Sequence, residues 1–128
     1  MRLLLDTHIF LWFVFGDALL NAKLRLLIED KNNEKFLSMA SVWEMAIKVS
    51  TGKLELHQPV EPFIAQQLQR EDFHLLPIAL NHAAKVSTMP FHHRDPFNRL
   101  IIAQGLTEAM PVVSVDPVFD AYGVQRLF

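Results

Sequence analysis

Four acidic residues occupy positions from which a folded chain could bring them to one place. Asp6 and Asp116 each follow a short apolar run that is typical of a buried strand. Asp95 precedes a stretch that begins like a helix, and Glu44 lies inside another helix-like stretch. The carboxyl ends of parallel strands face the crevice in which open α/β sheets bind ligands. Carboxylates that converge there repel one another unless a divalent cation binds between them, so the pattern predicts a metal-dependent enzyme that acts on phosphates.

Each of these acids also has an ordinary structural explanation. Asp6, Asp95 and Asp116 could each cap the helix that follows, because Asp is among the preferred N-cap residues. Glu44 could close a capping box on Ser41, three residues earlier, or pair with a lysine four residues later. The functional interpretation therefore rests on the recurrence of acids at one end of the inferred sheet, rather than on any single acid.

Hydrophobic periodicity and turn residues predict strands that alternate with helices along the chain. The expected strands cover approximately residues 2–6, 35–39, 73–77, 112–115 and 124–127. The expected helices cover approximately residues 8–15, 18–30, 41–50, 60–70, 80–86 and 95–109. No repeat or linker interrupts them, so we expect residues 1–128 to form one domain. The predicted fold class is α/β, with a parallel sheet of four or five strands and helices on both faces.

The composition and charge limit the classes of protein to which the chain can belong. Of its 128 residues, 51% are hydrophobic, which fits a compact globule. Cysteine is absent, so a disulfide framework and a thiolate zinc site are both excluded. The net charge of −2 is unusual for a nucleic-acid-binding protein, although an acidic site would offset a basic surface in that sum. No apolar run approaches a membrane span, and no cleavage site follows the apolar start, so we expect a cytoplasmic protein with no membrane association.

Six histidines raise the question of a zinc site. His92 and His93 are adjacent, so their side chains diverge in most backbone conformations, and neither has a histidine partner four residues away. A histidine-based metal site is therefore disfavoured. We expect His92, His93 and Arg94, together with Arg99, to form a wall that contacts the phosphates of a substrate.

Four segments carry motifs that are far more specific in combination than any acid alone. They are Leu4-Leu5-Asp6-Thr7-His8 with Leu11-Trp12, then Ser41-Val42-Trp43-Glu44-Met45-Ala46-Ile47-Lys48 with Gly52-Lys53-Leu54, then His93-Arg94-Asp95-Pro96-Phe97-Asn98-Arg99 with Ile102-Ala103-Gln104, and Ser114-Val115-Asp116 with Tyr122. In order and spacing they resemble the PIN-domain ribonucleases, and within them the VapC-type toxins of bacterial toxin–antitoxin pairs. The resemblance covers essentially the whole chain.

The resemblance implies a PIN-like fold, in which a twisted parallel sheet of four or five strands is covered by helices on both sides. It implies an endoribonuclease that depends on Mg²⁺ or Mn²⁺ and hydrolyses the phosphodiester bonds of RNA. It also implies a homodimer that is inhibited by a cognate antitoxin. In such an enzyme the metal would polarise the scissile phosphate and activate water for in-line attack.

The resemblance also assigns roles to individual residues. By position, the catalytic acids correspond to Asp6, Glu44, Asp95 and Asp116. All of these except Glu44 correspond to metal ligands, which would bind the ion through carboxylate oxygens and bound waters. The supporting residues are Thr7, whose hydroxyl lies beside the first acid, Asn98, and Ser114, whose hydroxyl would orient the last acid.

One position departs from the family pattern. Relatives usually read Asp-Pro-Phe-Asp-Arg, whereas this chain has Asn98 in place of the second acid. The motif leaves open whether Asp95 or position 98 matches the third acid of more distant PIN domains, and Asp120 could compensate. An asparagine can still bind a metal through its carbonyl oxygen, but it adds no charge. We therefore expect a metal site that is weakened, or one that is specialised for a single ion.

Two alternative functions follow from other features. Asn98 is the reason to consider a PIN-like protein that binds RNA or a partner with weak or no nuclease activity. A receiver-type signalling domain has a similar length and sheet, but it needs neighbouring acids after the first strand and a lysine after the fifth. Here Asp6 is followed by Thr7-His8, and no lysine follows Lys85, so the receiver alternative is disfavoured.

Overall fold

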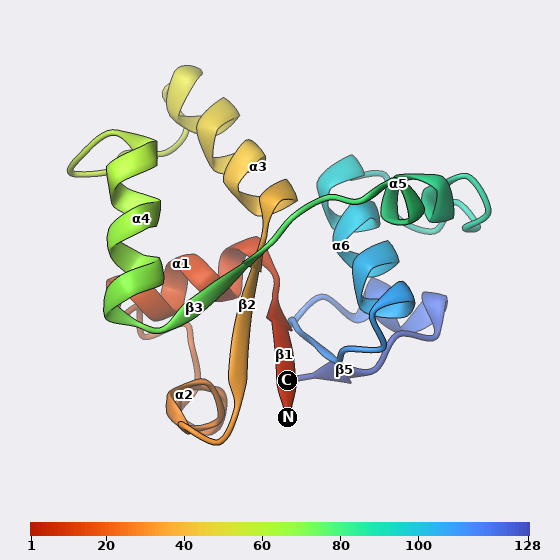
Figure 1. Ribbon diagram of the computed structural model, residues 1–128, viewed down its shortest axis with the longest axis horizontal. Helices are drawn as coiled ribbons and strands as arrows, with labels where there is room; N and C mark the ends of the chain where they lie inside the picture. Colours follow the sequence, from red (N-terminus) through yellow and green to blue (C-terminus); the bar gives the residue numbers. More distant parts are fainter.

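The computed structural model describes residues 1–128 and contains a five-stranded sheet in which every neighbouring pair of strands is parallel (Figure 1). The strands are β1 (Arg2–Leu5), β2 (Glu34–Ser38), β3 (Phe73–Leu76), β4 (Val112–Val113) and β5 (Arg126–Leu127). Figure 1 shows β3 crossing the direction of β1 at an angle, as the twist of a parallel sheet requires. The predicted α/β fold is confirmed, and the fifth strand is present as the short β5.

The strand order reverses at β1, and this reversal decides where a ligand can bind. The spatial order is β3-β2-β1-β4-β5, so the chain builds one half of the sheet on one side of β1 and then crosses to the other side. A crevice forms outside the carboxyl ends of the strands at such a switch point. Asp6 directly follows β1 at this switch point, and Asp116 lies just beyond the end of β4.

Six α-helices and a 3₁₀-helix cover both faces of the sheet (Figure 1). They are α1 (Thr7–Phe15), α2 (Ala22–Glu29), α3 (Met39–Ser50), α4 (Val60–Arg70), α5 (Leu80–Val86), α6 (Pro96–Thr107) and η1 (Pro117–Tyr122). Successive side chains of a strand point to opposite faces. Leu3 and Leu5 accordingly pack with residues of α1, α2 and α4, whereas Leu4 packs with residues of α6 and η1. None of these helices combines the length and the apolarity that a membrane span requires.

Helix α2 begins later than its apolar spacing predicted. Gly16 ends α1 in the left-handed conformation, with a φ of 63°. The Asp17 side chain then accepts from the Leu19 N–H at 2.9 Å in a turn, and Asn21 caps α2 by accepting from the Leu24 N–H at 2.8 Å. The polar side chains at both positions stabilise the turn and the cap, so the helix starts at Ala22.

The prediction that Ser41 caps the third helix, with Glu44 closing a capping box, is wrong. Helix α3 follows β2 without a loop, and its N-cap is Ser38, whose hydroxyl accepts from the Ala40 N–H at 3.0 Å. Ser41 and Glu44 both lie inside the helix and are buried. The serine-to-glutamate spacing of a capping box also places two residues on the same face of a helix, and here it serves that second purpose.

A buried polar network fixes α6 against the carboxyl end of β2. The Gln104 side chain accepts from the Ser38 hydroxyl and donates to the Pro77 carbonyl at 3.3 Å. Its amide also lies 3.4 Å from Nδ1 of the buried His82 on α5. Because these polar groups are buried and all of them are hydrogen-bonded, the network holds the start of α3 and the last turns of α6 in a defined relation.

Candidate active site

Asp6 and Asp116 stand near the carboxyl ends of two paired strands, β1 and β4. The Asp6 N–H donates to the Val113 carbonyl at 3.1 Å, which continues the pairing of the two strands. Each aspartate also caps the helix that follows it. Asp6 Oδ1 accepts from the Ile9 N–H at 2.8 Å, and Asp116 Oδ1 accepts from the Val118 N–H at 3.0 Å. The caps orient both carboxylates and leave Oδ2 of each outside its own helix cap.

Asp6 is almost completely buried, with 5% of its surface exposed. Loss of hydration raises the pKa of its carboxyl above the usual value. Hydrogen bonds from the Ser114 hydroxyl and the Ile9 N–H lower that pKa in part, as does nearby His8, while the negative charge of Asp116 raises it again. The charged form of Asp6 is therefore unfavourable here, and a cation bound beside it would offset this cost.

Glu44 contacts the hydroxyl of Thr7, the residue that follows the first acid. Thr7, the residue after Asp6, lies with its Oγ1 2.7 Å from Glu44 Oε1 and 2.9 Å from the Ser41 hydroxyl. The second oxygen of Glu44 forms an ion pair with Lys48 at 2.7 Å, one turn later on α3. The predicted pairing with the lysine is thus present, yet Glu44 is only 4% exposed and does not lie on a solvated face. The structure joins Glu44 and Thr7 to the Asp6 side of the site.

A second group of polar side chains gathers at the start of α6. Asp95 caps this helix, because its Oδ1 accepts from the N–H groups of Phe97 at 2.8 Å and Asn98 at 3.3 Å. Its Oδ2 accepts from Asn98 Nδ2 at 3.4 Å. His93 Nε2 lies 2.9 Å from Asp116 Oδ2 and 3.2 Å from Asn98 Nδ2. His93 thus lies between Asp116 and the first turn of α6, where Asn98 donates to Asp95.

The contacts of His93 define which of its nitrogens donates. Nδ1 accepts from the Asp95 N–H at 3.1 Å. An imidazole that accepts at one nitrogen carries its proton on the other, so Nε2–H donates to Asp116. Asn98 Nδ2 is itself a donor, so its proximity to Nε2 is not a hydrogen bond, and it donates to Asp95 instead. From the sequence we expected His93 in a wall that contacts phosphates, whereas in the structure it lies inside the acidic cluster as a partner of Asp116.

The other basic residues of that predicted wall are placed differently from one another. His92 and Arg94 are exposed on the loop before α6. Arg99 is buried and is not brought to the cluster, since it donates to two backbone carbonyls at 3.0 and 3.3 Å and to the Tyr122 hydroxyl at 3.3 Å. The same hydroxyl accepts from the N–H groups of His92 at 2.9 Å and His93 at 2.7 Å. Arg99 and Tyr122 thus fix the loop that carries His93. The only sign of this role in the sequence was that Tyr122 belongs to the family motif.

The acidic cluster has the donor chemistry of a site for Mg²⁺ or Mn²⁺. Its donors are carboxylate and amide oxygens, which these hard cations prefer. No three Asp, Glu or His side chains stand close enough together to form a preassembled metal site. Mg²⁺ commonly binds through one or two carboxylates and keeps several waters. The pair of Asp6 and Asp116 therefore fits such an ion, with Asp95 joined to the pair through His93.

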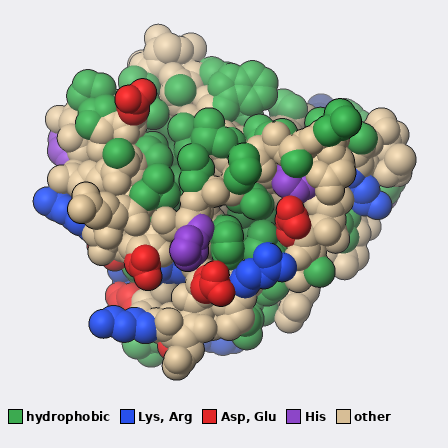
Figure 2. All heavy atoms as spheres, in the orientation of Figure 1, with side chains coloured by type: hydrophobic (Ala, Val, Ile, Leu, Met, Phe, Trp, Pro, Cys, Tyr) green, Lys and Arg blue, Asp and Glu red, His purple; other side chains and the backbone are tan.

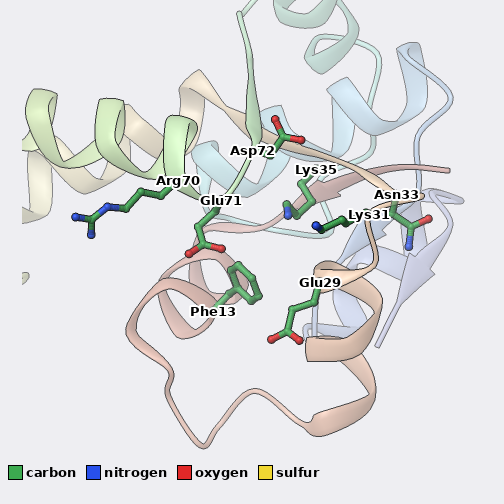
Figure 3. A pocket seen from close by; sticks show the side chains of 8 residues that line it. All are labelled: Phe13, Glu29, Lys31, Asn33, Lys35, Arg70, Glu71 and Asp72. Atoms are coloured by element: carbon green, nitrogen blue, oxygen red, sulfur yellow. The ribbon is translucent and has the colours of Figure 1, made fainter.

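The two largest cavities lie away from this cluster. One of about 430 Å³ opens at the amino ends of β2 and β3, where three cations and three acids line it and their charges balance (Figure 3). Lys35 in this cavity is held between two rings, with its Nζ 5.9 Å from the Phe13 centroid and 5.4 Å from the Phe73 centroid. The other, also about 430 Å³, is an apolar groove between α3 and α4, on a face where hydrophobic side chains gather (Figure 2). Neither is lined by a predicted site residue.

A family model and several solved structures match this chain. The model of the PIN domain matches residues 3–125. The comparison with curated proteins finds no match.

The solved structures that resemble this fold cover nearly all of the chain. VapBC2 from Rickettsia felis, bound to a DNA fragment from its promoter, has a TM-score of 0.74 at 16% identity and covers 100% of this chain and 98% of its own. DNA-bound VapBC from Salmonella typhimurium has a TM-score of 0.72 at 11% identity, with coverages of 100% and 97%. FitAcB from Neisseria gonorrhoeae has a TM-score of 0.65 at 18% identity, with coverages of 98% and 96%. At these identities the likeness shows a shared fold.

We predict that Asp6→Asn raises the melting temperature of the metal-free protein at neutral pH. Because burial raises the pKa of folded Asp6, the unfolded chain loses this proton at a lower pH than the folded protein. The folded state therefore loses stability as the pH rises from the usual value of 3.8 through the raised pKa, and the loss persists above it. Asparagine removes this cost and remains a good N-cap for α1. Thermal unfolding with a chelator, from acidic to neutral pH, measures the difference.

The control for this prediction is Asp30→Asn, which changes an exposed aspartate that accepts from the Asn32 N–H at 2.9 Å. It should leave the pH dependence of the melting temperature as in the parent. An Asp6→Asn variant that melts lower than the parent at every pH would contradict the interpretation of Asp6 as a penalised buried charge.

Proposed function

The chain belongs to the PIN-domain family, as its motifs predicted, and on that premise we propose that it is a Mg²⁺- or Mn²⁺-dependent endoribonuclease and the toxin of a toxin–antitoxin pair. PIN domains are generally nucleases, and the proposal assigns that chemistry to the cluster at the switch point of the sheet. The observation that carries it is the position of Asp6 and Asp116 after two paired strands, where the negative charge of Asp116 raises the pKa of Asp6 and His93 donates to Asp116 while accepting from the Asp95 N–H. A divalent cation beside these carboxylates would offset their repulsion, and phosphodiester hydrolysis uses such an ion.

We assign Asp6 and Asp116 as the principal metal ligands, and Asp95 as a third acid that acts directly or through water. When bound, a divalent cation supplies positive charge that polarises a phosphate and favours deprotonation of an attacking water. Asn98 offers a carbonyl oxygen at the same place, because its amide nitrogen is already directed to Asp95.

The remaining residues of the site orient these acids. The Ser114 hydroxyl accepts from the Asp116 N–H at 3.1 Å and favours the ionised form of Asp6, so it acts on both ligands. His93 Nε2–H holds Asp116 Oδ2, and a carboxylate oxygen can accept this bond while a second lone pair faces a cation. Thr7 holds Glu44 beside the first acid. Such supporting bonds determine how well a carboxylate is aimed at its ion.

The proposed partners are an RNA substrate, a cognate antitoxin and a second copy of the chain. The antitoxin is supported by the solved structures of similar fold, which are VapBC and FitAB complexes. The apolar groove between α3 and α4 offers a surface on which a protein segment could pack. The homodimer is proposed from the family resemblance.

Two observations favour the second candidate, a PIN-like protein that binds RNA without cutting it. Asn98 replaces an acid that relatives carry, and Glu44 is already neutralised by Lys48. An RNA cleavage assay decides between the nuclease and the RNA-binding protein, because the two candidates differ only in whether the bound RNA is cleaved.

For the nuclease, we predict that purified protein cleaves single-stranded RNA in the presence of Mn²⁺ or Mg²⁺, and that Asp6→Asn and Glu44→Gln each reduce the rate by more than about 100-fold. Glutamine keeps the size of Glu44 and its contact with Thr7, but removes the charge. The assay follows a fluorescent RNA with and without chelator. Glu55→Gln is the matched control, because Glu55 is exposed and the same change there should leave the rate unaltered. Full activity in Glu44→Gln would return Glu44 to a structural role, and full activity in Asp6→Asn would refute the assigned metal site.

We also predict that Asn98→Asp lowers the metal concentration needed for half-maximal cleavage by about tenfold, which corresponds to roughly 1–2 kcal/mol. Asn98 Nδ2 lies 3.4 Å from Asp95 Oδ2, so a carboxylate at position 98 would add negative charge beside Asp95. A metal titration of both proteins on one RNA measures the shift, with the melting temperature as a check on folding. An Asp variant that needs as much metal as the parent would place position 98 outside the metal site and leave Asp95 as the third acid.

A further inference from the structure

Two aromatic side chains join the helices that carry the acidic residues. Trp43 precedes Glu44 on α3, and Phe97 lies in the first turn of α6, between Asp95 and Asn98. Their ring centroids are 5.1 Å apart at an interplanar angle of 82°, an edge-to-face contact. The pair therefore lies at the edge of the acidic cluster and spans from one of its helices to the other.

Trp43 remains exposed despite this contact. About half of it, 56%, is accessible, whereas Phe97 is half-buried. Ile47, one turn later on α3, is also exposed, at 39%. A tryptophan in contact with one neighbour and open to solvent presents a large, rigid apolar surface that the fold itself does not need.

The charge of the cluster limits how it could hold a polyanion. The negative charges of Asp116 and Asp95 repel a phosphate backbone when metal is absent, whereas Glu44 is paired with Lys48, and the chain as a whole carries a net charge of −2. His92 and Arg94 are the exposed basic residues on the loop before α6. Attraction between charges alone is therefore a weak source of affinity, and an uncharged contact close to the acids is required.

We propose that Trp43 is a stacking surface for an unpaired nucleobase next to the phosphate that is cleaved. This inference rests on the proposed nuclease function and names a residue that contacts its substrate. Proteins recognise single-stranded RNA by stacking splayed bases on aromatic side chains, a contact that depends little on charge. The edge-to-face contact with Phe97 fixes the Trp43 ring, which lowers the entropy cost of ordering it on binding.

Stacking on Trp43 would distinguish an unpaired RNA strand from a duplex. A base within a duplex is stacked on both faces by its neighbours and cannot also stack on Trp43. The protein should therefore bind and cleave an unpaired strand in preference to the same sequence in a duplex. Trp43 contacts the base and not the reacting atoms, so it should affect substrate binding more than the chemical step.

The fluorescence of Trp43 tests the contact directly. Trp12→Phe leaves Trp43 as the single tryptophan, and Asp6→Asn in the same chain prevents cleavage during the measurement. Titration with a short single-stranded RNA of mixed sequence, with Mg²⁺ present, should quench the emission, and the same RNA annealed to its complement should not. Absence of quenching at RNA concentrations that bind the protein, monitored by anisotropy of labelled RNA, would overturn the proposal.

Kinetics in chains that retain Asp6 provide the second test. Trp43→Leu should raise KM by about tenfold while kcat changes by no more than about twofold, and Trp43→Phe should recover most of the loss. Phe15→Leu is the control, because Phe15 is an aromatic of similar exposure, 48%, which stacks on Phe63 at the far end of α1. An unchanged KM in Trp43→Leu, with wild-type cleavage intact, overturns the stacking proposal and leaves the nuclease proposal standing. Failure of the wild-type chain to cleave any RNA overturns the nuclease, whereas quenching in that case still supports the base contact.

The competing occupant of this surface is a second copy of the chain. Sedimentation of the wild-type and Trp43→Leu proteins distinguishes the two. A Trp43→Leu protein that sediments as the wild type supports the RNA contact. A variant that dissociates, combined with unquenched Trp43 emission in the Trp12→Phe, Asp6→Asn chain, would assign Trp43 to a protein interface and overturn the proposal.

Discussion

A carboxylate at the end of a buried strand loses most of its hydration, and Asp6 has a second carboxylate, Asp116, near the end of the neighbouring strand. Burial and the second negative charge both disfavour the ionised form of Asp6. The Ser114 hydroxyl and the Ile9 N–H offset this cost only in part, because the pKa of Asp6 remains raised. The caps of α1 and η1 hold these two acids in place, and a divalent cation is the ligand that their repulsion favours.

The fold combines the structural and functional roles of its acids. Asp6, Asp95 and Asp116 each cap a helix through Oδ1, and the second oxygens of Asp95 and Asp116 contact site residues. The cap fixes the direction of the carboxylate, so a single side chain both starts a helix and aims an oxygen at the site. Helix-capping and ligand-binding interpretations of these acids are therefore compatible. Asparagine substitutions separate them, since Asn caps a helix about as well as Asp but carries no charge.

Local sequence patterns predicted the helices and strands well, because the formation of these elements depends mainly on residues that are close together in the chain. The apolar run before Asp6, the Asp-Pro helix starts and the alternation of strands and helices all appear in the structure. The Ser41 capping box failed because Ser38, at the end of a strand that passes directly into α3, caps the helix first. The spacing of Ser41 and Glu44 reflects their shared face toward Thr7, a contact that exists only after β1 and β2 have paired.

Contacts between distant segments explain the rest of what the sequence left undetermined. His93 and Asp116 are 23 residues apart, and Thr7 and Glu44 are 37 residues apart, so neither pair leaves a local pattern. Arg99 lies within the site motif, yet its donors hold the loop before α6 through Tyr122 and backbone carbonyls. Motif membership thus identified residues near the site, whereas only the tertiary structure separated those that face it from those that support it.

We propose that Asp6 and Asp116 bind one divalent cation between them. The direct test is a crystal structure of the protein grown with Mn²⁺, with anomalous scattering to locate the ion. We expect an anomalous peak at bonding distance from carboxylate oxygens of both residues, at the carboxyl ends of β1 and β4. A peak confined to the charged cavity around Lys35 at the opposite end of the sheet, or no peak at saturating Mn²⁺, would contradict it.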